Sequence, residues 1–110
     1  MADVLKQSNT QITDVTGAAL IDGASSTTYT VLSITICEIG NGSGKNFNVW
    51  RADAGGSTNR RYLYYEQPIP GKATFVHNDK LVLEATQELW VSAPAGSSSL
   101  DVVVSYLEQT

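Results

Sequence analysis

The sequence predicts one all-β domain, built as a sandwich or a barrel of antiparallel strands. Its composition is typical of strands and tight turns, because apolar residues make up 42% of the chain and charged residues only 16%, while Ser, Thr and Gly are abundant. Turn residues separate short alternating segments at intervals of about 8 to 12 residues, which predicts about eight strands. No segment has the helical period of about 3.6 residues, and no linker divides the chain into two domains.

Residues 28–39 form the longest run of β-branched and apolar residues, and neither Pro nor Gly interrupts it before Gly40. This run predicts a long strand through the middle of a sheet. Its apolar residues change phase, because Tyr29 and Val31 share one face while Ile34 and Ile36 lie on the other, and this requires a bend or a bulge. We interpret the run as a strand that turns a corner between two packed sheets. A short strand buried on both faces is the alternative.

The first 17 residues carry Val4, Leu5 and Ile12 at spacings too irregular for one face of a helix. We therefore expect an extended N-terminal arm or an edge strand there. A short apolar piece bounded by Gly17 and Gly23 follows and leads to the long strand. The expected organisation is an arm at residues 1–17 and a β-domain at residues 18–110.

Glycine-rich turns frame the next strands. Residues 40–44 alternate Gly with Asn and Ser, which supply the positive φ values of a hairpin, so we expect the long strand to reverse there. Residues 45–53 predict a strand that a second turn closes at residues 54–57. Residues 60–67 predict an aromatic strand in which Leu63 and Tyr65 lie opposite Tyr62 and Tyr64.

Prolines mark the start of the second half. Pro68 and Pro70 cannot donate to a strand ladder and Gly71 suits a type II turn, so residues 68–71 are expected to be a loop. Further strands are expected at residues 73–77, 81–83 and 89–93. The last strand begins at Leu100, with alternate residues facing the core.

The charge balance restricts the classes of partner. Seven Lys and Arg residues against eleven Asp and Glu residues give a net charge of −4, which repels phosphate backbones and anionic lipids. We therefore expect no nucleic acid and no membrane as partners. The lone Cys37 cannot form an internal disulfide, and the N-terminus lacks the apolar centre of a signal peptide, so we expect assembly in a cytoplasm.

Motifs for catalysis, cofactors and metals are not indicated. The sequence GNGSGKN at residues 40–46 lacks the first Gly and the final Ser or Thr of a phosphate-binding loop. His77 is the only histidine, which leaves no multi-histidine metal site, and the Cys37 thiol in an apolar strand is a poor nucleophile. We expect no enzymatic activity, no cofactor and no bound metal.

Aromatic and arginine side chains are the remaining candidates for a binding surface. Trp50, Trp90 and the tyrosines of residues 62–65 could stack on sugars, but a sandwich core or a subunit interface requires the same residues and is the favoured interpretation. Three arginines, Arg51, Arg60 and Arg61, could reach carboxylates of a partner or form a solvated face.

Three segments of the chain resemble small virion structural proteins of tailed bacteriophages. They are YTV at residues 29–31, SITICEIGNGSGKNFNVW at residues 33–50 and LVLEATQELWVSAPAGSSSLDVVVSYLE at residues 81–108. The resemblance implies a jelly-roll-like antiparallel β-sandwich without enzymatic activity that attaches to the capsid or tail of a virion, often as a head decoration or cement protein. Residues 1–17 lie outside the pattern and could dock on the partner.

The resemblance therefore predicts a capsid decoration (cement) protein. It would self-associate, as a homotrimer, bind the major capsid protein and stabilise the shell from the capsid exterior. The candidate interface residues are Val4, Leu5, Ile12, Trp50, Arg51, Arg60, Arg61, Tyr62 and Tyr64. A tail, neck or fibre component of the virion is one alternative, and a carbohydrate-binding module that uses Trp50 or residues 62–65 is another.

Overall fold

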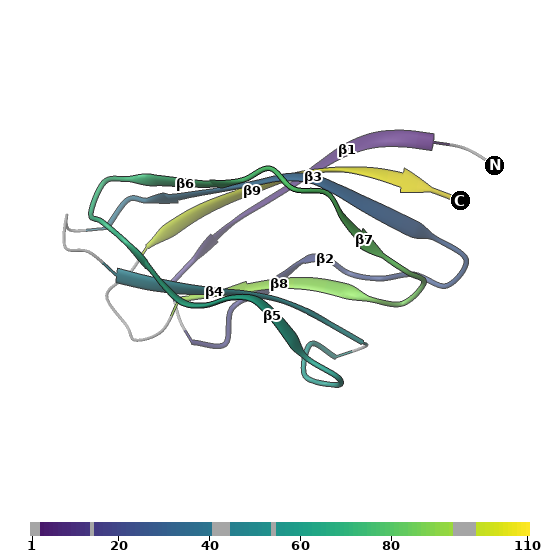
Figure 1. The fold of residues 1–110 in the computed structure, drawn as a ribbon, viewed down its shortest axis with the longest axis horizontal. Coiled ribbons are helices and arrows are strands. Elements are labelled where there is room, and N and C mark those ends of the chain that lie inside the picture. The colour runs from purple at the N-terminus through teal and green to yellow at the C-terminus, as the bar shows by residue number, and fades with distance from the viewer. Residues whose placement is uncertain (1–2, 14, 41–44, 54, 94–98) are drawn as a thin grey trace.

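The computed structural model describes residues 3–13, 15–40, 45–53, 55–93 and 99–110 (Figure 1). The strands within them are β1 (Asp3–Ile12), β2 (Ala18–Ile21), β3 (Thr28–Glu38), β4 (Lys45–Ala52), β5 (Arg61–Ile69), β6 (Thr74–His77), β7 (Leu81–Leu83), β8 (Glu88–Ser92) and β9 (Leu100–Gln109). The predicted fold class is confirmed, because the described chain is all-β and its two antiparallel sheets form a jelly-roll-like β-sandwich.

The two sheets form two layers. The first sheet has the strand order β1-β9-β3-β6, with β7 also paired to β3, and the second has the order β2-β8-β4-β5. Figure 1 shows the first sheet above the second, with the chain crossing between them several times. The ends of the chain lie side by side, since Asp3 pairs with Gln109 and Ile12 with Leu100. The strands of one sheet are therefore drawn from distant parts of the sequence.

The core fills the space between the layers with alternate residues of each strand. Phe47 is fully buried at its centre, and its ring centroid lies 5.0 Å from that of Phe75 and 6.2 Å from that of Tyr64. The Tyr64 hydroxyl is hydrogen-bonded to Nδ1 of His77 at 2.7 Å, which satisfies two polar groups at the core boundary. Aromatic residues of β4, β5 and β6 thus join the two sheets.

β3 is the long central strand that the sequence predicts, and a bulge does lie within it. Its register against β9 shifts between Val31 and Ser33. The extra residue returns Ile34 and Ile36 to the inner face, where they are buried together with Tyr29 and Val31. The expectation that the two pairs lie on opposite faces is therefore wrong. The predicted corner between sheets is also wrong, because every described strand that pairs with β3 (β6, β7 and β9) belongs to the first sheet.

β1 is an edge strand of the first sheet, which is one of the two expectations for the N-terminal residues. It pairs with β9 along its whole length, from Asp3 to Ile12. The strand is part of the sandwich, because the Ile12 side chain belongs to the hydrophobic core. The other edge of β1 pairs with no described strand, which leaves a row of backbone N–H and C=O groups for another chain.

The connection from β3 to β4 differs from the expected hairpin. These strands belong to different sheets, so the glycine-rich segment joins two layers, while residues 41–44 themselves lie outside the described part. The second turn is found as predicted, because β4 and β5 form an antiparallel pair and the Asp53 N–H donates to the Thr58 carbonyl at 2.8 Å.

The proline region also differs from the expected loop. β5 continues through Pro68 to Ile69, which a proline permits because β5 lies at the edge of the second sheet. The turn follows one residue later than expected. The Ala73 N–H donates to the Pro70 carbonyl at 3.2 Å, and the positive φ of 62° falls on Lys72. The Lys72 N–H donates to the Glu38 carboxylate at 3.2 Å, which helps to hold that conformation.

Candidate functional site

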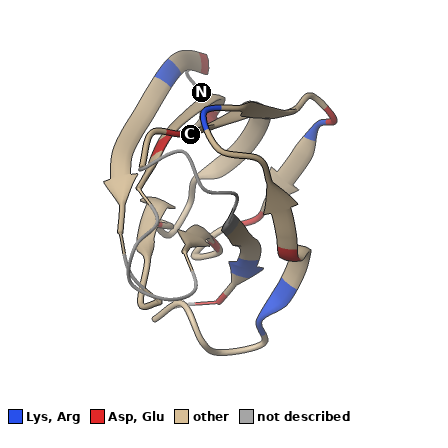
Figure 2. Ribbon diagram, turned by 90° about the vertical axis from the view of Figure 1, so that its left-hand side faces the viewer, with Lys and Arg blue, Asp and Glu red and all other residues tan. Residues whose placement is uncertain are grey.

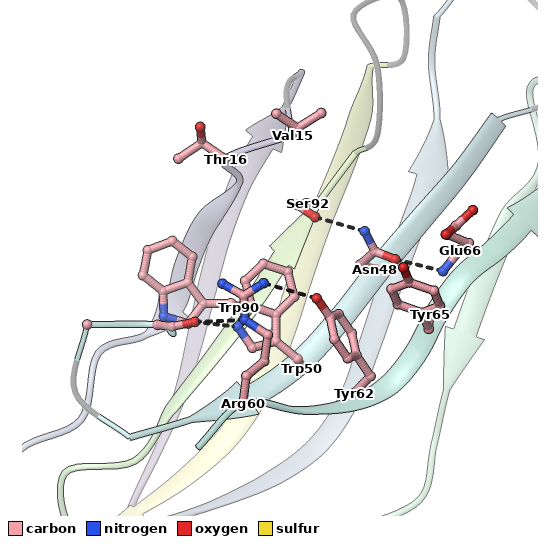
Figure 3. A pocket seen from close by; sticks show the side chains of 12 residues that line it. Val15, Thr16, Asn48, Trp50, Arg60, Tyr62, Tyr65, Glu66, Trp90 and Ser92 are labelled. Carbon is pink, nitrogen blue, oxygen red and sulfur yellow. Dashed lines mark hydrogen bonds between the residues drawn. The ribbon is translucent and has the colours of Figure 1, made fainter. Parts of the chain in front are cut away.

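A pocket of about 450 Å³ lies on the outer face of the second sheet; we call it the outer pocket (Figure 3). β4 and β8 contribute its base through Asn48, Trp50, Trp90 and Ser92. These side chains point away from the core because their neighbours in the two strands point into it. The connection from β1 to β2 and the strand β5 provide opposite sides of the pocket.

Two stacked tryptophans form the base of the outer pocket. The ring centroids of Trp50 and Trp90 are 5.9 Å apart and their planes differ by 15°. Trp50 is only 2% exposed, and its indole N–H donates to the Gly56 carbonyl at 2.8 Å, while the indole of Trp90 donates to Glu88 at 2.8 Å. The pair is therefore a fixed support, and Trp50 cannot itself stack on a ligand.

Arg60 covers the buried tryptophan. Its guanidinium carbon lies 4.3 Å from the Trp50 ring centroid, an arrangement that a cation–π interaction stabilises. Nε donates to the Gly56 carbonyl at 3.2 Å, and Nη1 donates to the Tyr62 hydroxyl at 3.0 Å. The cation is thus committed to contacts within the chain.

Tyr62 and Tyr65 are the exposed rings of the outer pocket, with 41% and 64% of their surface accessible. Their centroids are 4.8 Å apart and their planes meet at 72°. Tyr64, in contrast, packs against the core. We expected one face of this strand to carry Leu63 and Tyr65 and the other face to carry Tyr62 and Tyr64. This expectation is wrong, because shifts in the β4–β5 register break the alternation.

A strained residue follows Tyr65. Glu66 has a φ of 49°, which is uncommon for a residue with a side chain, and its N–H donates to the Asn48 carboxamide at 2.7 Å. The Asn48 amide in turn donates to the Ser92 hydroxyl at 3.3 Å. The Glu66 carboxylate accepts a hydrogen bond from Tyr65 and places negative charge beside it, and both effects raise the pKa of the Tyr65 hydroxyl.

The outer face of the first sheet is a second candidate surface. Strand register places on it the exposed side chains of Leu5, Val76, Val82 and Val103. It also carries Asp3 and Asp101 at its two ends, each hydrogen-bonded to a glutamine side chain. The strand register places the other described residues of β1, β3 and β9 that lie on this face between Asp3 and Asp101, and all of them are uncharged. We call this surface the uncharged face.

Charges elsewhere on the molecule are dispersed. Figure 2 shows short basic and acidic segments scattered over strands and turns, without a large area of one sign. Lys6 and Glu108 form an ion pair of 3.0 Å across β1 and β9. Arg51 donates to the Asn59 carbonyl at 2.9 Å. Among the residues that the structure describes, this distribution gives no basic groove for a nucleic acid.

The candidate interface residues are found in three settings. Val4 and Leu5 are exposed on β1, as an interface requires. Arg60 and Tyr62 line the outer pocket, while Arg51 and Arg61 hold nearby carbonyl groups of the chain. Ile12 and Trp50 are each 2% exposed and Tyr64 packs on the core, so these three are corrected to internal residues.

Asn48, Glu66 and Ser92 were not predicted for any site. A signal for two of them is visible once β4 and β8 are known to be adjacent. Asn48 and Trp50 alternate with buried apolar residues in one strand, and Trp90 and Ser92 do so in the next. Glu66 has no such signal, because a bulge sets its position.

Cys37 and His77 lie on opposite faces of the first sheet, since Cys37 pairs with Thr74 and His77 pairs with the inward-facing Ile34. They therefore cannot act together as nucleophile and base. Among the described residues, no group of His, Cys, Asp and Glu side chains is placed to hold a metal ion. The same part of the chain has no helix of the length and apolarity needed to cross a bilayer.

Comparisons with known proteins identify the fold but no sequence family. No protein-family model matches the sequence, and no curated protein matches it. Among solved structures, a Bacillus endospore appendage protein from disulfide-linked pili has a TM-score of 0.57 at 9% identity, over 98% of this chain and 88% of that one. The Eiger TNF of S. frugiperda has a TM-score of 0.57 at 10% identity, over 98% and 93%.

A viral protein shares the same architecture. The infectious bursal disease virus VP2 of a subviral particle has a TM-score of 0.53 at 10% identity, over 96% of this chain and 32% of that one. This chain thus spans about a third of the VP2 chain. These similarities establish a jelly-roll, TNF-like β-sandwich that also occurs in pilus and viral capsid proteins.

Proposed function

We propose that this protein is a non-enzymatic structural subunit of a bacteriophage virion, a capsid decoration (cement) protein that self-associates as a trimer and binds the major capsid protein on the capsid exterior. The resemblance of residues 18–110 to small phage virion proteins supports this role. The fold is compatible with it, since two similar structures are named for assemblies, the pili and the subviral particle.

The uncharged face carries the proposal. With a net charge of −4, two copies repel each other overall, but this face can pack on the neighbouring copies of a trimer without bringing like charges together. Ten residues of β1 at about 3.3 Å each, and four strands about 4.8 Å apart, give a flat area of roughly 600 Å². This is close to the accessible surface of about 800 Å² that each partner of a stable complex buries. The uncharged face is therefore large enough to form the main part of a self-association contact.

The free edge of β1 supplies the contact with the capsid. An extended segment of the major capsid protein can add to this edge through backbone hydrogen bonds, which give affinity and require little of the side chains. Each copy then bridges shell subunits that are already in position, so modest contacts repeated over the shell stabilise it. Assembly would take place in the host cytoplasm.

Two charge substitutions test the role of the uncharged face. Val103→Glu and Leu5→Glu change exposed side chains, so both variants should fold, while the new charges meet their counterparts in the assembled form. We expect both variants to sediment as monomers and to bind stripped phage heads at least about tenfold more weakly. Ser25→Glu adds the same charge in an exposed turn and should behave as the wild type. Unchanged assembly and binding of both face variants would contradict the proposal.

The protein composition of purified virions tests the location. A decoration protein should be present in hundreds of copies, on the order of the number of capsid subunits, and heads without it should rupture at a lower temperature. A few copies that co-purify with tails would instead make the protein a tail, neck or fibre component.

A further inference from the structure

The outer pocket lies on the opposite side of the sandwich from the uncharged face, because the pocket is on the outer face of the second sheet and the uncharged face is on the first; Figure 1 shows the two sheets as separate layers. It therefore stays open to solvent when the first sheet is covered by another copy. Its volume of about 450 Å³ is within the range of small-ligand sites. What it binds can be inferred independently of the virion role.

The pocket offers apolar ring surface in two orientations. Tyr62 and Tyr65 meet edge to face, so they present ring surface in two nearly perpendicular directions. The stacked tryptophans beneath them add the partly exposed edge of Trp90. Such rings suit a flat ligand face of C–H groups with polar groups around its rim, because Tyr and Trp combine an apolar body with a polar end.

The polar groups of the pocket are neutral donors and acceptors beside one carboxylate. The Asn48 amide has two N–H groups and uses one on Ser92, which leaves one for a ligand. The Ser92 hydroxyl, which is only 2% exposed, accepts that bond and so fixes the orientation of the Asn48 amide. Glu66 adds carboxylate oxygens at the rim. Hydroxyl groups, which both donate and accept, match this set.

The backbone strain at Glu66 supports a functional role for this arrangement. A left-handed non-glycine residue costs free energy and persists only where the surroundings hold it, here through the hydrogen bond from Glu66 to Asn48. The bulge that includes it places Tyr65 and Glu66 together at the pocket, and bulges of this kind commonly re-aim side chains at binding sites.

An anionic ligand suits this pocket less well than a neutral one. The one cation among its lining residues, Arg60, lies over the Trp50 ring and already donates to the Gly56 carbonyl and the Tyr62 hydroxyl. The Glu66 carboxylate and the net negative charge of the chain repel a phosphate or a carboxylate.

We infer that the outer pocket binds a neutral pyranose residue of a glycan, with the sugar face stacked on Tyr65, the sugar edge against Tyr62, and Asn48 and Glu66 hydrogen-bonded to its hydroxyl groups. A single site of this size gives weak binding, but many copies on one particle multiply it through avidity. On a virion, such a site would hold the particle on a glycan-coated cell surface.

The first experiment is an array of neutral and sialylated glycans probed with the labelled protein, clustered on beads to allow avidity. We expect signals on glycans that end in neutral hexoses and none on sialylated ones. The methyl glycoside of each terminal sugar is then titrated against tryptophan fluorescence, because Trp90 and Trp50 lie at the pocket. The fluorescence should change saturably for the sugars found on the array and not for the others.

Matched variants locate the site. Tyr65→Ala should weaken binding about tenfold or more, whereas Tyr65→Phe keeps the ring and should weaken it much less. Asn48→Ala tests the hydrogen-bonding part, and Val76→Ala, an exposed apolar change on the other sheet, is the control. No binding to any neutral glycan, or binding that Tyr65→Ala and Asn48→Ala leave intact, would overturn the inference. Head binding and oligomeric state of the same variants report separately on the virion role.

Discussion

The place of β1 in the core can be tested with one substitution on each side of the strand. Ile12 and Leu5 belong to the same strand, but Ile12 is 2% exposed and Leu5 is 74% exposed. Ile12→Ala removes about three buried carbon groups at about 0.8 kcal/mol each and leaves a cavity among core side chains, which together should lower the free energy of unfolding by about 3 kcal/mol. Leu5→Ala should change it by less than about 0.5 kcal/mol.

Urea unfolding followed by tryptophan fluorescence measures both variants, because Trp50 and Trp90 lie in the other sheet and report on the whole domain. In a separate thermal unfolding experiment, a loss of about 3 kcal/mol should lower the melting temperature by roughly 12 °C for a chain of this size. Equal and small effects of the two substitutions would refute the reasoning, since they would mean that β1 is detached from the sandwich in solution.

Three further predictions follow from the same contacts. Deletion of residues 1–15 should abolish cooperative unfolding in calorimetry, because it removes Ile12 and the complete β1–β9 ladder; a folded truncated domain would show that the N-terminus is a separable arm. Gly56→Ala should lower the free energy of unfolding by about 1–3 kcal/mol and alter tryptophan emission, because Gly56 has a φ of 76° and a Cβ there would overlap Trp90. An unchanged emission spectrum and an unchanged urea midpoint would contradict a fixed tryptophan base of the pocket. Burial, and then the charge of Glu108, raises the pKa of the Tyr29 hydroxyl. The folded state therefore holds the hydroxyl proton more tightly than the unfolded chain does, and the free energy of unfolding should fall as the pH rises above about 10. Urea midpoints measured across this pH range should fall less steeply for Tyr29→Phe than for the wild type. An identical fall in the two proteins would show that Tyr29 does not cause the loss of stability.

The two faces of the sandwich separate the two proposed roles. The uncharged face and the edge of β1 belong to the first sheet, and the outer pocket belongs to the second. A substitution on one sheet should therefore leave the other role unchanged, because sites this far apart and without shared partners act almost independently.

Local patterns were sufficient to predict the fold class and most strands. The strands β3, β4, β8 and β9 lie close to their predicted residues, because period-2 alternation and Gly- or Pro-containing turns depend only on neighbours in the chain. The turn between β4 and β5 was predicted for the same reason. The bulge in β3 was also anticipated from a phase change that the sequence displays.

Part of the candidate site was visible in the sequence as well. The aromatic residues of β4, β5 and β8 stood out by composition, and Tyr62, one of the candidate interface residues, is exposed. Trp50 was not, because its burial depends on Arg60 and the Gly56 turn folding over it. Asn48 and Glu66 meet only through the β4–β5 pairing.

The sequence by itself determined that this chain is a β-sandwich with a low charge density and aromatic strands. Only the tertiary structure decided which strands share a sheet, that Ile12 is internal, and that the inner face of β3 continues across its bulge. The physical reason is that pairings such as Asp3 with Gln109 join residues from opposite ends of the chain. Their free energy comes from packing between whole strands, which no local pattern of residues encodes.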